Sequence, residues 1–172
     1  MYQRGLTLLE LLIALSILGI VLALGIPGFQ QQTDKIRART ATNNLYSAIR
    51  AARTQAIYQN HRTTIRALGT WAQGWEIFTD ENHNGILDPG ETRLQQHRLD
   101  NDLLHVEGNR PVKRYISFIG TGESRYATGS SGGAFQAGTL TLCSKSGETG
   151  HQLVLASMGR VRIQQAQPDD CP

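Results

Sequence analysis

Residues 4–29 read RGLTLLELLIALSILGIVLALGIPGF. Between Leu6 and Phe29 the conventionally polar side chains are Thr7, Glu10 and Ser16. At a rise of 1.5 Å per residue, a helix over this span is about 36 Å long, whereas the hydrocarbon core of a bilayer is about 30 Å thick. A signal peptide would have a shorter apolar core followed by a small-residue cleavage site, which this stretch lacks. The sequence therefore predicts a membrane-anchoring helix that is retained.

Glu10 is the unusual residue of this stretch. A carboxylate inside an apolar helix costs about 2.5 to 3.5 kcal/mol on insertion scales, so Glu10 needs a partner or a place at the membrane interface. If the chain were cut after Gly5, the new amine would lie on Leu6, one helical turn from Glu10. The two charges could then neutralise one another, within one subunit or between subunits.

The string from Arg4 to Leu12, followed by an apolar helix and Pro27, resembles the class III leader of type IV pilins and type II secretion pseudopilins. The resemblance implies that a prepilin peptidase cuts after Gly5, that Leu6 is then methylated, and that Glu10 assists assembly. Leu6 stands where Phe is commoner in that family. The resemblance also implies an inner-membrane protein that later joins a pilus or pseudopilus.

Apolar residues continue beyond this stretch at steps of three and four, which predicts an amphipathic helix. They are Ile36, Leu45, Ala48, Ile49, Ala52, Ala56 and Ile57. We expect a leader at 1–5, a transmembrane or filament-core helix at 6–29, an amphipathic helix at 30–60 and a β-rich periplasmic head at 61–172. Pro27 lacks a backbone donor and permits a bend.

Beyond Arg62 the sequence alternates short strand patterns with turn residues. The expected strands are 63–68, 74–79, 92–99, 103–107, 115–119, 139–144, 152–157 and 161–164. The expected fold class is α+β, with the long N-terminal helix packed on an antiparallel β-sheet head. The long helix, residues 74–80 and residues 159–161 are similar to the group of minor pilins and pseudopilins called pseudopilin H and fimbrial T/U.

The net charge of +3 combines two unlike regions. Residues 30–66 contain seven basic side chains and one acidic one, whereas residues 67–172 contain nine basic and twelve acidic ones. The basic stretch is typical of a solvated helix face, with contact to anionic lipid, nucleic acid or acidic neighbours as alternatives. The five histidines have no metal-ligand spacing, and no residue pattern indicates an enzyme.

Two cysteines, Cys143 and Cys171, match no metal-binding spacing. In an oxidising compartment such a pair predicts a disulfide bond, which would stabilise the fold by roughly 3 to 4 kcal/mol. A pair of buried thiols is the alternative.

Residues 80–91 fit the spacing of an EF-hand calcium loop. The candidate ligands are Asp80, Asn82, Asn84, Asp88 and Glu91. No helix pair is expected on either side of this loop, and Pro89-Gly90 stands where a helix would begin. The sequence favours a polar hairpin turn at Asn84-Gly85 over a calcium site, and we expect no obligatory cofactor.

Gly159-Arg160-Val161-Arg162 forms the candidate binding motif. In a strand, Arg160 and Arg162 would share a face, and two guanidinium groups suit the phosphates of a nucleic-acid backbone. Gly159 would leave space for close approach. The alternatives are a solvated strand face or ion pairs with Asp169 and Asp170. Further phosphate contacts are predicted at Lys113, Arg114 and Lys145.

The motif resembles the GRxR element of fimbrial T minor pilins, which implies binding of double-stranded DNA in natural transformation. We therefore expect a minor pilin of a type IV pilus, near the filament tip, with other pilins, the prepilin peptidase, the inner membrane and DNA as partners. The alternative is a type II secretion pseudopilin that contacts other pseudopilins and an exported protein.

Overall fold

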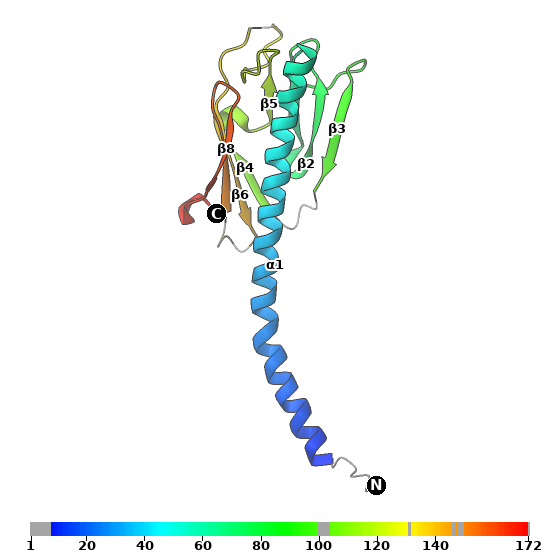
Figure 1. Ribbon diagram of the computed structural model, residues 1–172, viewed down its shortest axis with the longest axis vertical. Coiled ribbons are helices and arrows are strands. Elements are labelled where there is room, and N and C mark those ends of the chain that lie inside the picture. The colour runs from blue at the N-terminus through cyan, green and yellow to red at the C-terminus, as the bar shows by residue number, and fades with distance from the viewer. Residues whose placement is uncertain (1–7, 100–103, 131, 146, 148–149, 172) are drawn as a thin grey trace.

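The computed structural model describes residues 8–99, 104–130, 132–145, 147 and 150–171 (Figure 1). One long helix, α1 (Leu8–Gln59), runs the length of the molecule. Its C-terminal half lies against the β-rich head, and its N-terminal half extends away from the head. The expected leader, residues 1–5, and Leu6 lie outside the described residues.

The described strands form two antiparallel sheets of four strands each. The first sheet has the order β3-β2-β1-β5, and the second has the order β4-β6-β7-β8. The first contains β1 (Thr63–Leu68), β2 (Thr70–Thr79), β3 (Arg93–Arg98) and β5 (Tyr115–Phe118). The second contains β4 (Leu104–Gly108), β6 (Gly138–Ser144), β7 (Gly150–Leu155) and β8 (Val161–Gln165). Two 3-10 helices, η2 (Arg110–Val112) and η3 (Pro168–Asp170), complete the described elements.

The two sheets pack on α1 through a stripe of small and branched residues at helical spacing. Its buried members are Ala38, Ala41, Leu45, Ala48, Ile49, Ala52 and Ala56. The alanines of the stripe let the strands approach the helix axis closely. The larger core side chains come from the sheets, among them Ile65, Trp71, Trp75 and Phe118. The core therefore lies between α1 and both sheets.

The expected fold class is confirmed. All eight predicted strands exist, with ends that differ from the predictions by a few residues; β2 begins at Thr70 instead of Gly74. The antiparallel head consists of two sheets. The prediction that Ile36 and Ile57 belong to the buried apolar stripe is wrong, because they are 56% and 48% exposed. The helix turns them away from the strands.

The N-terminal part of α1 leaves its apolar side chains uncovered. The large ones between Leu8 and Leu22 are 51–77% exposed. Within the part of the chain that the structure describes, no helix contains a stretch long and apolar enough to cross a membrane.

The loop between β5 and β6 is fixed to the head by buried polar groups. The guanidinium of Arg62 is buried and donates to Ser117 Oγ at 2.9 Å and to the carbonyl oxygen of Arg125 at 3.2 Å. Burial lowers the pKa of Arg62, and the charge of Asp80 opposes this shift. Gln136 is also buried and bonds the backbone of Pro111, Tyr115 and Ser117. The loop between β5 and β6 is therefore partly interior.

Candidate functional site: the hairpin between β7 and β8

The hairpin that carries the arginine motif joins β7 to β8, and β8 is an edge strand of its sheet. The Gly159 N–H donates to the Ala156 carbonyl, and the Ala156 N–H donates to the Arg160 carbonyl, both at 2.8 Å. Gly159 has φ +75°, which a residue with a side chain adopts with strain. This geometry is that of a tight hairpin whose last turn residue is glycine.

Gly159 is buried, and the space beside it belongs to the protein. A Cβ atom on Gly159 would collide with the carbonyl oxygen of Gly122. The predicted opening for a ligand is thus taken up by the loop between β5 and β6. Gly159 serves the site by letting the hairpin pack closely on this loop.

Arg53 of α1 connects the helix to the hairpin and to the loop between β5 and β6. Its Nε donates to the Gly122 carbonyl at 2.8 Å, and its Nη2 donates to the Met158 carbonyl at 3.3 Å. Helix, loop and hairpin are therefore held together at one point. Sequence reasoning placed Arg53 on a solvated helix face, and no local pattern could have paired it with residues 122 and 158.

Arg160 and Arg162 are both exposed. Among the residues that the structure describes, neither guanidinium forms an ion pair, so the predicted alternative of pairing with Asp169 and Asp170 is wrong. The Asp170 carboxylate instead accepts from the Gln167 N–H at 2.7 Å. Both arginine charges are available to an external anion.

A hollow of about 380 Å³ lies between α1 and the hairpin, and we call it the upper hollow. Arg160 lines it, whereas Arg162 lies on β8 opposite Val154 and is not part of its wall. The wall consists of Tyr46, Arg50, Arg53, Thr54, Gly159, Arg160 and Val161. The structure thus adds arginines of the helix to the predicted site.

The other predicted phosphate contacts lie elsewhere on the head. Lys113 and Arg114 are exposed after η2, whose Val112 packs against Gly138 of β6, so β6 and β7 separate them from β8. Lys145 is exposed at the end of the sheet where β7 begins, whereas Arg160 follows the end of β7. The length of β7, about 20 Å, separates the two ends. The structure does not bring these three residues to the hairpin.

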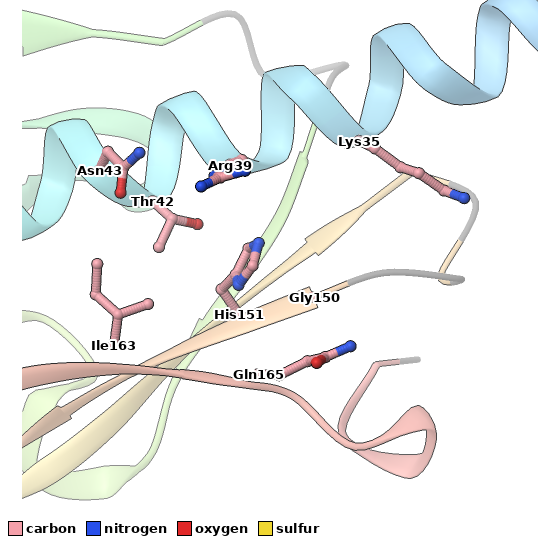
Figure 2. Close-up of a pocket in the computed structure, with 8 residues that line it drawn as sticks. All are labelled: Lys35, Arg39, Thr42, Asn43, Gly150, His151, Ile163 and Gln165. Carbon is pink, nitrogen blue, oxygen red and sulfur yellow. The ribbon is translucent and has the colours of Figure 1, made fainter.

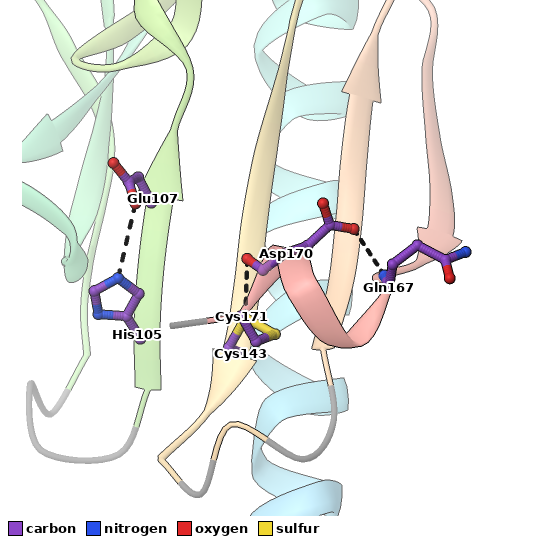
Figure 3. The surroundings of a disulfide bond; sticks show 6 residues. All are labelled: His105, Glu107, Cys143, Gln167, Asp170 and Cys171. Carbon is purple, nitrogen blue, oxygen red and sulfur yellow. Dashed lines mark hydrogen bonds and ion pairs between the residues drawn. A yellow bond between two sulfur atoms is a disulfide. The ribbon is translucent and has the colours of Figure 1, made fainter.

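The predicted disulfide between Cys143 and Cys171 is confirmed, with a Cα–Cα distance of 5.7 Å. Figure 3 shows it tying the end of β6 to the C-terminal segment that follows β8. Gly150 lies directly beneath it, because a Cβ there would meet Cys171 Sγ. Strands β7 and β8 are therefore enclosed in a covalent loop.

A second hollow, of about 400 Å³, lies between α1 and the opposite end of β7 and β8 (Figure 2). We call it the lower hollow. Its wall consists of Lys35, Arg39, Thr42, Asn43, Gly150, His151, Ile163 and Gln165. It is basic as well, but it contains none of the predicted site residues.

The candidate calcium loop connects β2 to β3, which pair in antiparallel fashion. The predicted hairpin therefore exists, although it is a long loop and not a two-residue turn at Asn84-Gly85. The carboxylate of Asp80 is buried and accepts from the N–H groups of Asn84 and Gly85 at 3.0 Å. The Glu91 carboxylate accepts from the N–H groups of Glu81 and Asp88.

Asp88 accepts hydrogen bonds from the side-chain amides of Asn82 and Asn84, each at 2.7 Å. These bonds lower the pKa of Asp88, that from Asn82 contributing most. Calcium coordination would require both amides to turn their oxygens inward, which would break these bonds and the bond from the Ile86 N–H to Asn84 Oδ1. The calcium site was the less favoured alternative from the sequence, and nothing in the structure tests it.

We expect the loop to keep its shape without calcium. A calcium titration at neutral pH should leave the backbone amide chemical shifts of residues 80–91 unchanged, because the loop's carboxylates already accept hydrogen bonds. The matched control is Asp88→Asn, which removes the central acceptor charge. Shift changes that saturate with calcium in the wild type but not in this variant would establish a calcium site instead.

Two other expectations concern residues at or beyond the edge of the described chain. Gly5 and Leu6, the expected cleavage and methylation positions, lie outside the described residues. Glu10 lies in the first turn of α1 and is exposed.

Among the described residues, no group of three or more His, Cys, Asp or Glu side chains could hold a metal ion.

Known proteins match both parts of this architecture. The sequence profile of a family described as "Type II transport protein GspH" matches residues 41–159, and that of the "Prokaryotic N-terminal methylation motif" matches residues 1–26. The chain is 30% identical over 164 residues to "Pilin-like protein PilA1" of Thermus thermophilus, covering 95% of this chain and 100% of that protein.

Two crystal structures of the type IV minor pilin FimU of Pseudomonas aeruginosa, from different crystal forms, share the fold. Their TM-scores are 0.57 and 0.53 at 22% and 24% identity, covering 81% and 78% of this chain and 96% of FimU. The profile match to most of the head and the identity to PilA1 along nearly the whole chain establish the family. The protein belongs to the GspH family of pilin-like proteins, the minor pilins and pseudopilins, which are structural subunits that assemble with other pilin subunits.

Proposed function

We propose that this protein is a minor pilin of a type IV pilus that supports filament assembly and binds double-stranded DNA for natural transformation. The observation that carries the proposal is the exposed pair Arg160 and Arg162, without ion-pair partners among the described residues. Gly159 and Arg53 fix the hairpin that presents them. A fixed pair of charges loses little conformational freedom on binding.

The expected mode of binding is contact with the phosphate backbone. Guanidinium groups donate in pairs to phosphate oxygens, and such contacts carry no base sequence information. Binding is therefore independent of DNA sequence and weakens steeply with salt, because each neutralised phosphate releases condensed counterions. Lys113, Arg114 and Lys145 extend the contact only where DNA passes over other faces of the head.

We also propose the processing and location that pilins of this type require. The prepilin peptidase cuts after Gly5, the new N-terminus at Leu6 is methylated, and Glu10 pairs with a subunit's N-terminal amine during assembly. The match of residues 1–26 to the methylation motif supports this proposal. The exposed apolar side chains from Leu8 to Leu22 suit burial first in the inner membrane, with the head in the periplasm, and then in the filament.

A pseudopilin of a type II secretion machine is the second candidate. The description of the matching family, "Type II transport protein GspH", favours it. In that function the head contacts other pseudopilins and an exported protein, and the arginine pair has no nucleic-acid ligand.

A deletion strain separates the two functions. We expect loss of DNA uptake and reduced twitching, with exoprotein release unchanged, because the arginine pair suits a DNA ligand. Complementation with wild-type protein should restore both activities, Arg160→Ala/Arg162→Ala should restore twitching alone, and Glu10→Ala should restore neither. Loss of exoprotein release without loss of DNA uptake would contradict the proposal and establish the pseudopilin.

A further inference from the structure

The upper hollow brings an arginine of α1 to the same site as an arginine of the hairpin. Arg50 and Arg160 both line it, and both side chains are exposed. Within the described part of the chain, its wall contains basic, aromatic, hydroxyl and apolar residues and no carboxylate. A hollow of this composition attracts anions.

An aromatic ring orients Arg50. Its Cζ lies 5.6 Å from the centroid of the Tyr46 ring, a cation–π geometry. The Tyr46 side chain packs against the hydrophobic core, which fixes the ring. The Arg50 guanidinium is thus oriented before a ligand arrives, and binding costs less side-chain entropy.

Arg53 lines the same hollow but has another role. Its guanidinium bonds the carbonyls of Gly122 and Met158, so it holds the hairpin against α1. The carboxylate that follows Gly122 in the chain, that of Glu123, forms an ion pair with Arg125 at 2.8 Å. This pairing reduces the negative field near the hairpin.

We propose that Arg50 is a further DNA-binding residue, which together with Arg160 holds phosphate groups of one DNA strand in the upper hollow. Arg53 is a positioning residue for this site. The inference rests on the proposed DNA binding and deepens it, because the DNA contacts then include α1 as well as the hairpin. Backbone phosphates lie between two guanidinium groups supplied from opposite sides.

The test measures affinity and salt dependence for duplex DNA with the full mature chain in a neutral detergent. Each lost phosphate contact lowers the slope of log K against log salt by about 0.9. If a variant and the wild type bind equally at 1 M salt, the variant with one contact fewer then binds about eightfold more weakly at 0.1 M salt. We expect Arg50→Ala to lower both the salt slope and the affinity, and Arg160→Ala to do the same. Arg50→Lys should keep the slope, because it keeps the charge.

Arg37→Ala is the control, since Arg37 is an exposed arginine of the same helix outside the hollow, where it pairs with Asp34 at 3.7 Å. It should leave affinity and slope unchanged, and circular dichroism should show that all variants are folded. If Arg50→Ala matches the wild type while Arg160→Ala loses affinity, the inference is wrong and the proposed DNA binding stands. If the wild type binds no duplex DNA, the proposed function itself fails.

Discussion

Replacing Arg160 and Arg162 together by alanine should weaken binding of duplex DNA about 60-fold in 0.1 M salt. The estimate comes from two phosphate contacts, each contributing about 0.9 to the log–log salt slope, so the slope should fall by about 1.8. Both guanidinium groups are exposed and without ion pairs among the described residues, so the wild type gives up no internal contact on binding. Fluorescence anisotropy over a salt series measures both quantities.

The control for this prediction removes the same charge elsewhere. Arg98 on β3 and Arg110 in η2 are exposed and lie outside the hairpin and both hollows, so Arg98→Ala/Arg110→Ala has the same net charge as the test variant. It should retain nearly wild-type affinity at 0.1 M salt, since the Debye length there is about 10 Å. An equal loss in both variants would show that net charge, and not the hairpin, governs binding.

The helix and strands could be predicted from the sequence because their signals are local. Apolar residues at three and four positions indicate which face of α1 is buried, and alternation indicates the strands. Ile36 and Ile57 were assigned to the wrong face because an apolar residue at the edge of the stripe looks the same as one at its centre. Periodicity predicts which face of α1 is buried, whereas the packing of the strands determines how wide the buried stripe is.

The candidate site depends on contacts between distant residues, so the sequence predicted part of it. The motif at 159–162 is readable as a pair of basic side chains in a strand. The contacts from Arg53 to residues 122 and 158, and the placing of Arg50 beside Arg160, follow from packing of α1 on the second sheet. Lys145 shows the reverse case, a basic residue near the motif in sequence that β7 holds at the other end of the sheet.

Gly159 belongs to the predicted site, but its role there differs from the predicted one. A glycine beside two arginines suggests that a phosphate could approach the backbone there. The carbonyl group of Gly122 occupies the space beside Gly159 instead. The loop between β5 and β6 is rich in glycine and serine, a composition typical of a surface loop. Buried bonds from Arg62 and Gln136 hold it, and neither bond has a sequence signal.

Removing the disulfide should destabilise the head strongly. Cys143 and Cys171 are separated by 28 positions, and closing a loop of that size stabilises the folded state by about 3.5 kcal/mol in the chain-entropy model. For a chain of this size, Cys143→Ala/Cys171→Ala should lower the melting temperature by roughly 10 °C. Thermal unfolding followed by circular dichroism measures it, and wild-type protein in reductant should unfold at the temperature of the variant.

This change should separate stability from DNA binding. The disulfide lies at the end of the sheet where β7 begins, whereas Arg53 and Gly159 anchor the hairpin at the other end. Well below the melting temperature, the variant should therefore keep DNA affinity within about twofold of the wild type, because the covalent loop stabilises the head without orienting the arginines. An unchanged melting temperature would contradict the first expectation. A large loss of affinity in folded variant would show that the C-terminal segment, and not Arg53, sets the position of the hairpin.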